Sequence, residues 1–283
     1  MRSFRAYAEL TKPRIALMVL VTAYIGWRLA GGRGAGTLSW MLLGTGLSAL
    51  CAGSLNQYLE RGKDALMRRT RTRPLPQGRL RPGRALAFGL ACGLAGAWVL
   101  SWRVNALSAG LALATLCFYL LIYTPLKPVT PHSTWIGAAA GATGPLIGWA
   151  AARGELSPAA WALFAIQFLW QIPHFMAIFW MCREDYARAG FRVMPVLDPG
   201  GGTTACQIAL HSFALLLASL VPALCGLAGT PYGLWALALG AAFLGLGMRA
   251  SWTMALLDTR RLFLASLAYL PLLFGALVLC QPA

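Results

Sequence analysis

Residues 38–57 read LSWMLLGTGLSALCAGSLNQ and continue directly into YLERGKDALMRRTRTRP at residues 58–74. The first part carries no charged side chain and is long enough to cross a bilayer as an α-helix. Around the junction, Asn56, Glu60 and Asp64 are spaced four residues apart, which aligns them along one face of a helix. The stretch therefore predicts a membrane-spanning helix that ends in a ladder of oxygen ligands.

A run of arginines follows this ladder and includes Arg69 and Arg73. Two carboxylates and an amide are hard oxygen ligands of the kind that suits Mg²⁺, which keeps its other positions for water and substrate phosphates. Guanidinium groups bind phosphate oxygens through paired hydrogen bonds. The combination predicts a metal–diphosphate site at one end of the helix.

The rest of the chain has the composition of a membrane protein. Of its 283 residues, 58% are hydrophobic and only 11% are charged, which is unlike a soluble domain. We therefore predict an all-α integral membrane protein that forms a single domain over residues 1–283, as a bundle of nine transmembrane helices. We place the nine spans at residues 15–29, 38–57, 85–102, 106–123, 134–152, 161–181, 205–227, 232–248 and 262–280.

The basic residues predict the orientation of this bundle. With a cytoplasmic N-terminus, twenty Lys and Arg residues fall on the cytoplasmic side and four fall outside, namely Arg28, Arg33, Arg103 and Arg153. Cytoplasmic loops carry such an excess of Lys and Arg, so we expect the N-terminus inside and the C-terminus outside. The same asymmetry explains most of the net charge of +16, and no nucleic-acid partner is expected.

The seven cysteines are scattered and form no Cys-x-x-Cys pair. We interpret them as small buried apolar residues, not as disulfides or metal ligands. The first span follows a short basic tail that leaves no room for an organellar transit peptide, and the later spans distinguish it from a cleaved signal peptide. We expect a multi-pass protein of a bacterial cell (inner) membrane, in contact with lipid.

The acidic residues distinguish an enzyme from a transporter. Seven of the eight fall on the cytoplasmic side, Glu155 falls outside, and none lies in the middle of a span. Ion-coupled transporters usually place ionisable groups near the bilayer midplane. An enzyme that works at the membrane face therefore fits better, and a polytopic transporter stays as the alternative from another class.

Three further segments end at the same face. Residues 12–14 open the first span, residues 123–127 close the fourth, and residues 183–186 close the sixth. Taken singly, the basic residues are commonly snorkelling anchors, and Tyr123 is commonly an interfacial aromatic residue. Because acidic and basic clusters converge here from four segments, we favour the Mg²⁺–diphosphate site.

These motifs resemble those of the UbiA superfamily of intramembrane prenyltransferases over nearly the whole chain. The stretch Phe168-Leu169-Trp170-Gln171-Ile172-Pro173-His174-Phe175 resembles the heme-modifying branch, because the quinone and chlorophyll branches lack it. This chain departs from the usual pattern at three positions. Glu60 replaces an aspartate, Lys63 a nonpolar or aromatic residue, and Ser133 an asparagine. The other matching residues are Thr11–Arg14, the pattern from Asn56 to Gly78, Tyr123-Thr124 with Lys127, Ile136-Gly137, Gly141, Pro145–Trp149, Asp185-Tyr186, Ala189-Gly190 and Met194–Val196.

The resemblance implies that a farnesyl group passes from farnesyl diphosphate to a vinyl group of heme b, after which water adds. A prenyltransferase that acts on an aromatic quinone precursor is the alternative within the family. The implied catalytic and metal-binding residues are Asn56, Glu60, Asp64 and Asp185. The implied diphosphate-binding residues are Lys12, Arg14, Arg69, Arg73, Tyr123 and Lys127.

His174 is the residue on which heme recognition depends. In a span, a neutral imidazole can ligate heme iron, act as an acid or base, or hydrogen-bond across the bundle beside a proline kink. Helical rise places it about 16 Å from Asp185, so we expect it to serve the heme and not the diphosphate. His211 is a weaker candidate of the same kind, and His132 is expected on the surface. The accepted isoprenoid length and the oligomeric state do not follow from the sequence.

Overall fold

The chain folds entirely into helices in the part that the structure describes. This computed structural model covers residues 2–281, and no strand occurs among them. The all-α prediction is confirmed. In chain order the elements are α1 (Arg2–Leu10), α2 (Pro13–Leu29), α3 (Ala35–Asp64), α4 (Pro82–Arg103), α5 (Ala106–Cys117), the π-helix η1 (Phe118–Tyr123), α6 (Thr124–Leu126), α7 (Ser133–Gly141), α8 (Gly144–Arg153), α9 (Pro158–Met181), α10 (Arg183–Arg188), α11 (Met194–Leu197), α12 (Gly202–Leu224), α13 (Thr230–Thr253) and α14 (Leu256–Leu279).

Seven helical runs in this part of the chain are long and apolar enough to cross a membrane: α3, α4, the run from α5 to α6, α9, α12, α13 and α14. The other two predicted spans take different forms. The first is α2, which has 17 residues. The fifth is divided into α7 and α8, because Pro145 in the first turn of α8 has no N–H to continue the helix. The count of nine spans therefore stays a prediction.

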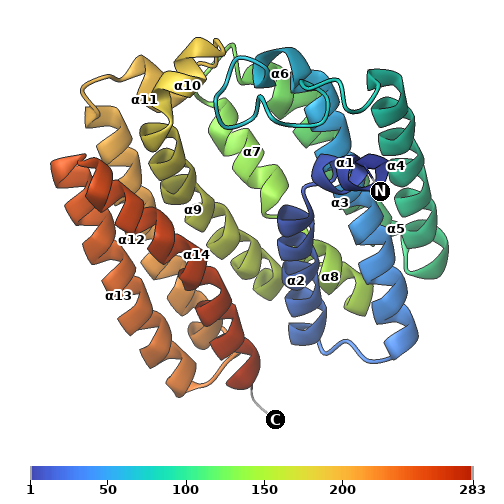
Figure 1. Cartoon of the computed structure of the whole chain (residues 1–283). Helices are drawn as coiled ribbons and strands as arrows, with labels where there is room; N and C mark the ends of the chain where they lie inside the picture. Colours follow the sequence, from blue (N-terminus) through green and yellow to red (C-terminus); the bar gives the residue numbers. More distant parts are fainter. Residues whose placement is uncertain (1, 282–283) are drawn as a thin grey trace.

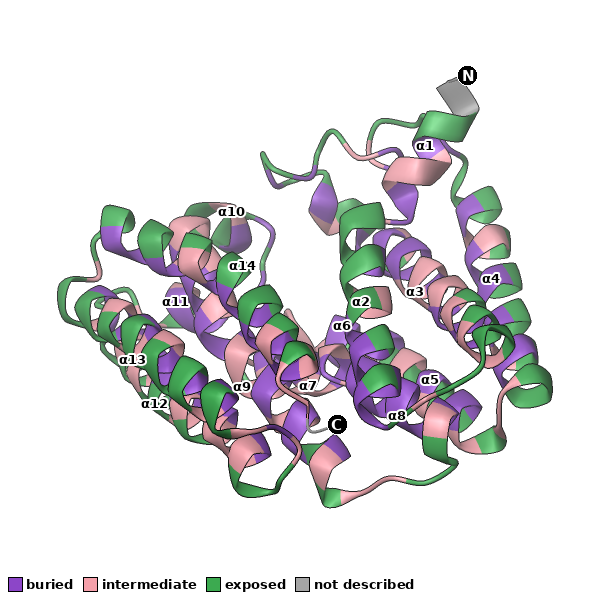
Figure 2. Cartoon of the chain, turned by 90° about the horizontal axis from the view of Figure 1, so that it is seen from below, coloured by how far each residue is buried: buried purple, intermediate pink, exposed green. Residues whose placement is uncertain are grey.

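The helices form two groups joined by a central pair. Helices α2, α3, α4, α5 and α8 lie on one side, and α12, α13 and α14 lie on the other, with α7 and α9 between them (Figure 1). The short helices α6, α10 and α11 gather at one end of the bundle, together with residues 65–81 (Figure 1). Buried residues face the inside of both groups (Figure 2).

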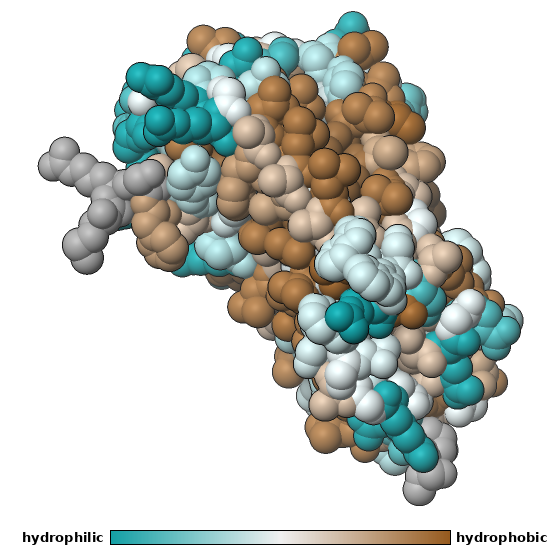
Figure 3. Space-filling view, turned by 90° about the vertical axis from the view of Figure 1, so that its right-hand side faces the viewer, coloured by the Kyte–Doolittle hydropathy of each residue, from teal (hydrophilic) through white to brown (hydrophobic). Residues whose placement is uncertain are grey.

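The outer surface is apolar where a soluble protein would be polar. One face shows a hydrophobic belt between two hydrophilic ends (Figure 3). Elsewhere on the surface too, large apolar side chains are exposed, such as Leu94 of α4 (74%) and Trp252 of α13 (91%), as expected for lipid contact. Helix α3 has 30 residues and is about 45 Å long, against a hydrocarbon core of about 30 Å. Its polar end at Asn56–Asp64 is therefore placed at head-group level.

Small residues bring the helices together. Gly26 of α2 packs against the backbone of Pro145, and Gly148 of α8 packs against the backbone of Ala23, with no room for a Cβ atom at either glycine. Gly96 of α4 packs in the same way against Gly44 of α3. Close backbone approach is how helices associate in lipid, where no hydrophobic effect drives them together.

The cysteines match the prediction only in part. All seven are free, and Cys51 and Cys92 are buried. Cys117, Cys206 and Cys225 are exposed, so the expectation of burial is wrong for these three. A lipid-facing surface is itself apolar, and a thiol is tolerated there as well as in a core.

We expect Gly148→Ala to lower the thermal unfolding midpoint of the detergent-solubilised protein. The added methyl group would meet the backbone of Ala23 and separate α2 from α8, at a cost of about 1–3 kcal/mol. Gly110→Ala on α5 is the matched control, because a Cβ there meets nothing within 4 Å. Equal midpoints for the two variants would contradict the close packing of α2 on α8.

Candidate active site

The predicted ladder of oxygen ligands lies on one face of α3 and lines a cavity. Asn56, Glu60 and Asp64 are 1%, 7% and 2% exposed. All three line a cavity of about 240 Å³ at the polar end of the helix. The four-residue spacing thus places the three side chains as the sequence indicates.

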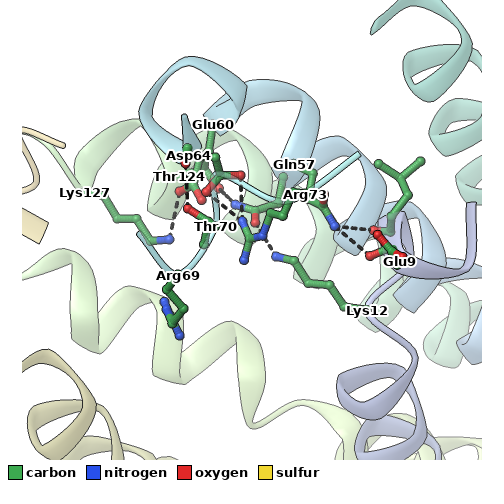
Figure 4. Close-up of polar contacts among 12 residues, drawn as sticks. Glu9, Lys12, Gln57, Glu60, Asp64, Arg69, Thr70, Arg73, Thr124 and Lys127 are labelled. Carbon is green, nitrogen blue, oxygen red and sulfur yellow. Dashed lines mark hydrogen bonds and ion pairs between the residues drawn. The ribbon is translucent and has the colours of Figure 1, made fainter. Parts of the chain in front are cut away.

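Each residue of the ladder is paired with a basic residue from another segment (Figure 4). Lys12 Nζ donates to Asn56 Oδ1 at 2.6 Å, and Lys127 Nζ donates to Glu60 Oε1 at 2.8 Å. Arg73 Nη1 lies 2.7 and 2.6 Å from the two oxygens of Asp64. Buried charges persist only when paired in this way, so the ladder holds three separate segments of the chain together.

Lys12 reaches the ladder through an unusual backbone conformation. Its φ is +51°, in the left-handed region that non-glycine residues occupy at a cost of about 1–3 kcal/mol. Gln57 of α3 holds the preceding turn, because its Nε2 donates to the carbonyls of Glu9 and Leu10. Burial lowers the pKa of Lys12 to about 7, and the charge of Arg73 acts in the same direction.

Lys127 is positioned by the π-helix η1. Thr124 Oγ1 donates to the carbonyl of Tyr119 at 2.7 Å and accepts from Asn56 Nδ2 at 3.3 Å. The Lys127 ammonium group lies 4.7 Å from the ring centre of Tyr123. π-Helical turns are often found at functional sites, and this one brings Tyr119 and Tyr123 into the cavity lining.

The segment 65–81 folds back over the cavity. Met67 packs in one cluster with Phe179, Tyr186 and Phe191, and Thr70 Oγ1 donates to the carbonyl of Asp64 at 2.9 Å. These two buried residues hold the arginine run against the site.

Arg69 differs from the other cations of the cavity. Its Nη2 donates to the hydroxyl of Tyr186 at 3.0 Å, and it makes no ion pair with a carboxylate in the described part of the chain. Burial raises the pKa of Tyr186, so the phenol keeps its proton. Even without Lys12, whose pKa is lowered to about 7, the lining contains three cationic residues, Arg69, Arg73 and Lys127, against two carboxylates.

The structure does not bring Asp185 to the other acids. Its carboxylate accepts from the backbone N–H of Arg69 at 3.3 Å and from Arg188 Nη1 at 2.8 Å, and it does not line the cavity. Burial opposes its ionisation, but these hydrogen bonds hold the pKa of Asp185 below its ordinary value. Arg14 is exposed and also lies outside the lining.

A second, apolar cavity of about 130 Å³ lies next to the first. It runs between α2, α3, α5 and the break between α7 and α8, and it shares Lys12, Ile15 and Tyr119 with the polar cavity. Most of its other residues are small, such as Ala49, Ala52, Gly53, Ala112 and Ala140.

His174 lines the polar cavity together with Glu60 and Asp64, so the two halves of the expected site adjoin. By contrast, both ring nitrogens of His211 have hydrogen-bond partners. Its Nδ1 lies 2.9 Å from the carbonyl of Gln207, and its Nε2 accepts from Trp135 at 3.4 Å. His211 therefore has a structural role, and His132 is exposed as predicted.

The donor set fits Mg²⁺ bound together with phosphate. No cluster of three or more His, Cys, Asp or Glu side chains occurs in residues 2–281. However, Mg²⁺ commonly takes only one or two carboxylates and completes its shell with water and substrate phosphates. Glu60, Asp64 and the Asn56 amide supply that number, beside cations that suit the phosphates.

The sequence did not indicate Gln57, Tyr119 or Ser266 as site residues. Gln57 lies inside the quoted motif, and its position next to Asn56 is the only signal. Tyr119 enters the lining through the π-helix, which the sequence does not predict. Ser266 is a single hydroxyl group within the apolar stretch of α14 and contacts His174.

Three comparisons place the chain among known proteins. Residues 17–278 match the profile of the UbiA prenyltransferase family. The protoheme IX farnesyltransferase of Solibacter usitatus is 46% identical over 98% of this chain and 99% of that protein. A solved structure of digeranylgeranylglyceryl phosphate synthase has a TM-score of 0.81 at 14% identity, with 99% of both chains covered. A UbiA homologue from Archaeoglobus fulgidus bound to DMAPP and Mg²⁺ has a TM-score of 0.67 at 14% identity, with 96% of this chain and 98% of that chain covered.

We expect the cavity to bind a multiply charged anion, because its cations outnumber its carboxylates. Inorganic pyrophosphate with Mg²⁺ should raise the thermal midpoint of the solubilised protein. Arg69→Ala should weaken that binding by about tenfold or more, the value of a charge-assisted hydrogen bond. Arg71→Ala is the matched control, since Arg71 is exposed in the same run and does not line the cavity. Equal losses in both variants would mean that the run acts only through its overall charge.

Proposed function

Because the chain belongs to the UbiA prenyltransferase family, we propose that it transfers a farnesyl group from farnesyl diphosphate to a vinyl group of heme b. The observation that carries the proposal is the junction of a cation-rich cavity with an apolar one at Lys12, Ile15 and Tyr119. A prenyl diphosphate has the same two parts. The choice of heme as acceptor is supported by relatives named protoheme IX farnesyltransferase, such as that of Solibacter usitatus.

The diphosphate half of the substrate is bound by the cations of the cavity. Lys12, Arg73 and Lys127 are paired with the ladder and would turn toward the diphosphate when it enters. Arg69 lines the cavity, and it is drawn apart from the two carboxylates, with which it makes no ion pair in the described part of the chain (Figure 4). Positive charge fixed where negative charge develops is the largest available contribution to rate. Tyr123, which lines the cavity, and Arg14, which is exposed and lies outside the lining, complete the proposed set.

Asn56, Glu60 and Asp64 would hold Mg²⁺, which when bound supplies Lewis-acid neutralisation of the leaving diphosphate. The Archaeoglobus fulgidus homologue bound to DMAPP and Mg²⁺ supports this use of the fold. Asp185 holds the backbone of Arg69 in the present contacts, and its role as a fourth ligand stays a prediction. Glu60 carries one methylene more than the aspartate usual in the family.

The isoprenoid chain would lie in the apolar cavity. The C1–O bond of farnesyl diphosphate breaks with both electrons on oxygen, and C1 bonds to the terminal carbon of the vinyl group. The cation left beside the porphyrin takes up water and releases a proton, which gives a hydroxyethylfarnesyl side chain. A dry, apolar lining protects the allylic cation from water before the carbon–carbon bond forms. Small residues such as Ala52 and Gly53 leave room for the chain.

His174 is the proposed contact with heme. It lines the polar cavity between Trp170, at 5.0 Å between ring centres, and Phe263, at 5.1 Å. Flat aromatic surfaces of this kind suit a porphyrin, and a neutral imidazole is a common axial ligand of heme iron.

We expect the purified protein, given farnesyl diphosphate, Mg²⁺ and heme b, to yield a product heavier than heme b by one hydrated farnesyl group. Asp64→Ala should reduce the rate by about 100-fold or more while the protein stays folded, because Asp64 lies at the exit of α3 from the bundle. Glu60→Asp should stay within a few-fold of the parent. Mass spectrometry of the extracted porphyrin measures the amount of product formed by the parent, by Asp64→Ala and by Glu60→Asp.

The control for this experiment is Asp258→Ala. Asp258 accepts from Arg249 and Arg261 and lies away from the cavity, so its loss should not change the product. Prenylation of an added aromatic acid, with heme b left unchanged, would instead indicate the quinone branch. Near-normal turnover of Asp64→Ala in excess Mg²⁺ would remove Asp64 from the proposed ligand set.

We also propose that residues 1–283 form one domain of nine spans in a bacterial cell membrane, with the N-terminus inside and the C-terminus outside. The distribution of basic residues supports this orientation. An alkaline phosphatase fused after Ala283 should be active and a green fluorescent protein at the same position dark. Fusions after Lys127 should give the opposite pair of results. A fluorescent fusion at Ala283 would show that the count of spans is even.

A further inference from the structure

We propose that Ser266 of α14 is a positioning residue that fixes the tautomer of His174, so that Nε2 offers a free lone pair to the cavity and to heme iron. The iron-binding part of this inference rests on the proposed function, whereas the tautomer part stands on the hydrogen bonds alone.

Ser266 is fully buried and lies against His174 across the interface of α9 and α14. Its Oγ lies 2.7 Å from His174 Nδ1 and 2.6 Å from the carbonyl of Phe263, one turn earlier in α14. A serine hydroxyl has one proton to donate and two lone pairs that accept. A carbonyl can only accept.

Both short contacts are hydrogen bonds in only one arrangement. The hydroxyl donates to the carbonyl of Phe263, and Nδ1 carries the proton that it donates to Ser266 Oγ. With the proton on Nε2 instead, the hydroxyl would have to choose between two acceptors, and one contact would be left without a proton. For a neutral imidazole, the pair of contacts therefore selects the Nδ1–H tautomer, in which Nε2 is unprotonated.

The orientation of the imidazole ring is fixed as well. The Trp170 ring stacks on His174 with an interplanar angle of 23°, and Trp170 Nε1 donates to the carbonyl of Ser266 at 2.8 Å. His174 Nε2 has no hydrogen-bond partner among residues 2–281. It is not one of the fully buried polar atoms that lack a partner, so part of its surface is accessible. His174 contributes to the cavity lining, and we place its free nitrogen at that lining. Histidines that bind metal usually donate their other ring N–H to a neighbouring acceptor in this way.

The test is ¹⁵N NMR of the full chain labelled at histidine, solubilised in detergent. The chain has only three histidines, so the ring nitrogens can be assigned with His174→Ala. In the parent, His174 should give the pattern of an Nδ1–H tautomer. Ser266→Ala removes the acceptor and should shift the tautomer ratio toward Nε2–H by about fivefold to tenfold. Ser266→Thr keeps the hydroxyl and should restore the parent pattern.

Two controls separate this effect from general loosening of the bundle. His211 bonds to Gln207 and Trp135, so its signals should not change in Ser266→Ala. Ser219→Ala removes another buried hydroxyl, which contacts Tyr269 of α14 and no histidine, and it should leave His174 unchanged.

The second measurement is titration of the same proteins with ferric heme b, followed by the Soret band. Ser266→Ala should weaken binding by about 10- to 100-fold, as is typical when the partner of a metal-binding histidine is lost, and Ser219→Ala should not. An unchanged His174 tautomer in Ser266→Ala, with heme binding intact in the parent, overturns the inference alone. A parent that binds no heme overturns the iron-binding part together with the proposed acceptor, and the NMR result decides the tautomer part separately.

Discussion

The whole arrangement depends on the cost of placing charge near lipid. Three polar groups of α3 point inward at the edge of the apolar bundle, and each is matched by one cation from a different segment: Lys12, Arg73 or Lys127. Two of these contacts, Arg73–Asp64 and Lys127–Glu60, are ion pairs, and leaving one of their charges buried and unpaired would cost far more than the pair contributes to stability. The three pairs thus require three segments to meet at one place, and that meeting forms the polar cavity.

The same pairs explain how a site of such high charge exists before any substrate is present. The carboxylates hold the cations in position, and the cations keep the carboxylates ionised. An incoming diphosphate with its metal ion would exchange partners with both sets. Little net charge has to be moved into the low-dielectric region during that exchange. The negative diphosphate enters together with its positive metal ion, and the cations and carboxylates of the protein change partners at the same time.

The sequence predicted the features that depend on periodicity and composition. Asn56, Glu60 and Asp64 share a helix face because a four-residue step is nearly one turn, and the apolar runs are helices because lipid leaves the backbone no other partner.

The sequence did not predict features that depend on contacts between distant segments. The resemblance implies that Asp185 shares a metal with Asp64, but the Asp185 carboxylate accepts a hydrogen bond from the backbone of Arg69. The pairing of Ser266 with His174 joins residues 92 positions apart, and no local pattern encodes it. The division into α7 and α8 was visible in principle at Pro145, within a run that otherwise has the composition of a continuous span.

The π-helix η1 has a consequence for insertions and deletions in this region. A π-helical hydrogen bond spans one residue more than an α-helical one, so η1 accommodates one extra residue in the run. Removing one residue between Phe118 and Tyr123 would return the run to an α-helix, and five α-helical residues turn through nearly the same angle as the six π-helical residues that they replace. Lys127 would then still face Glu60. Removing one residue from α5 instead would rotate Lys127 by about 100°, so the six-residue segment η1 is the part of this run that best tolerates a one-residue deletion.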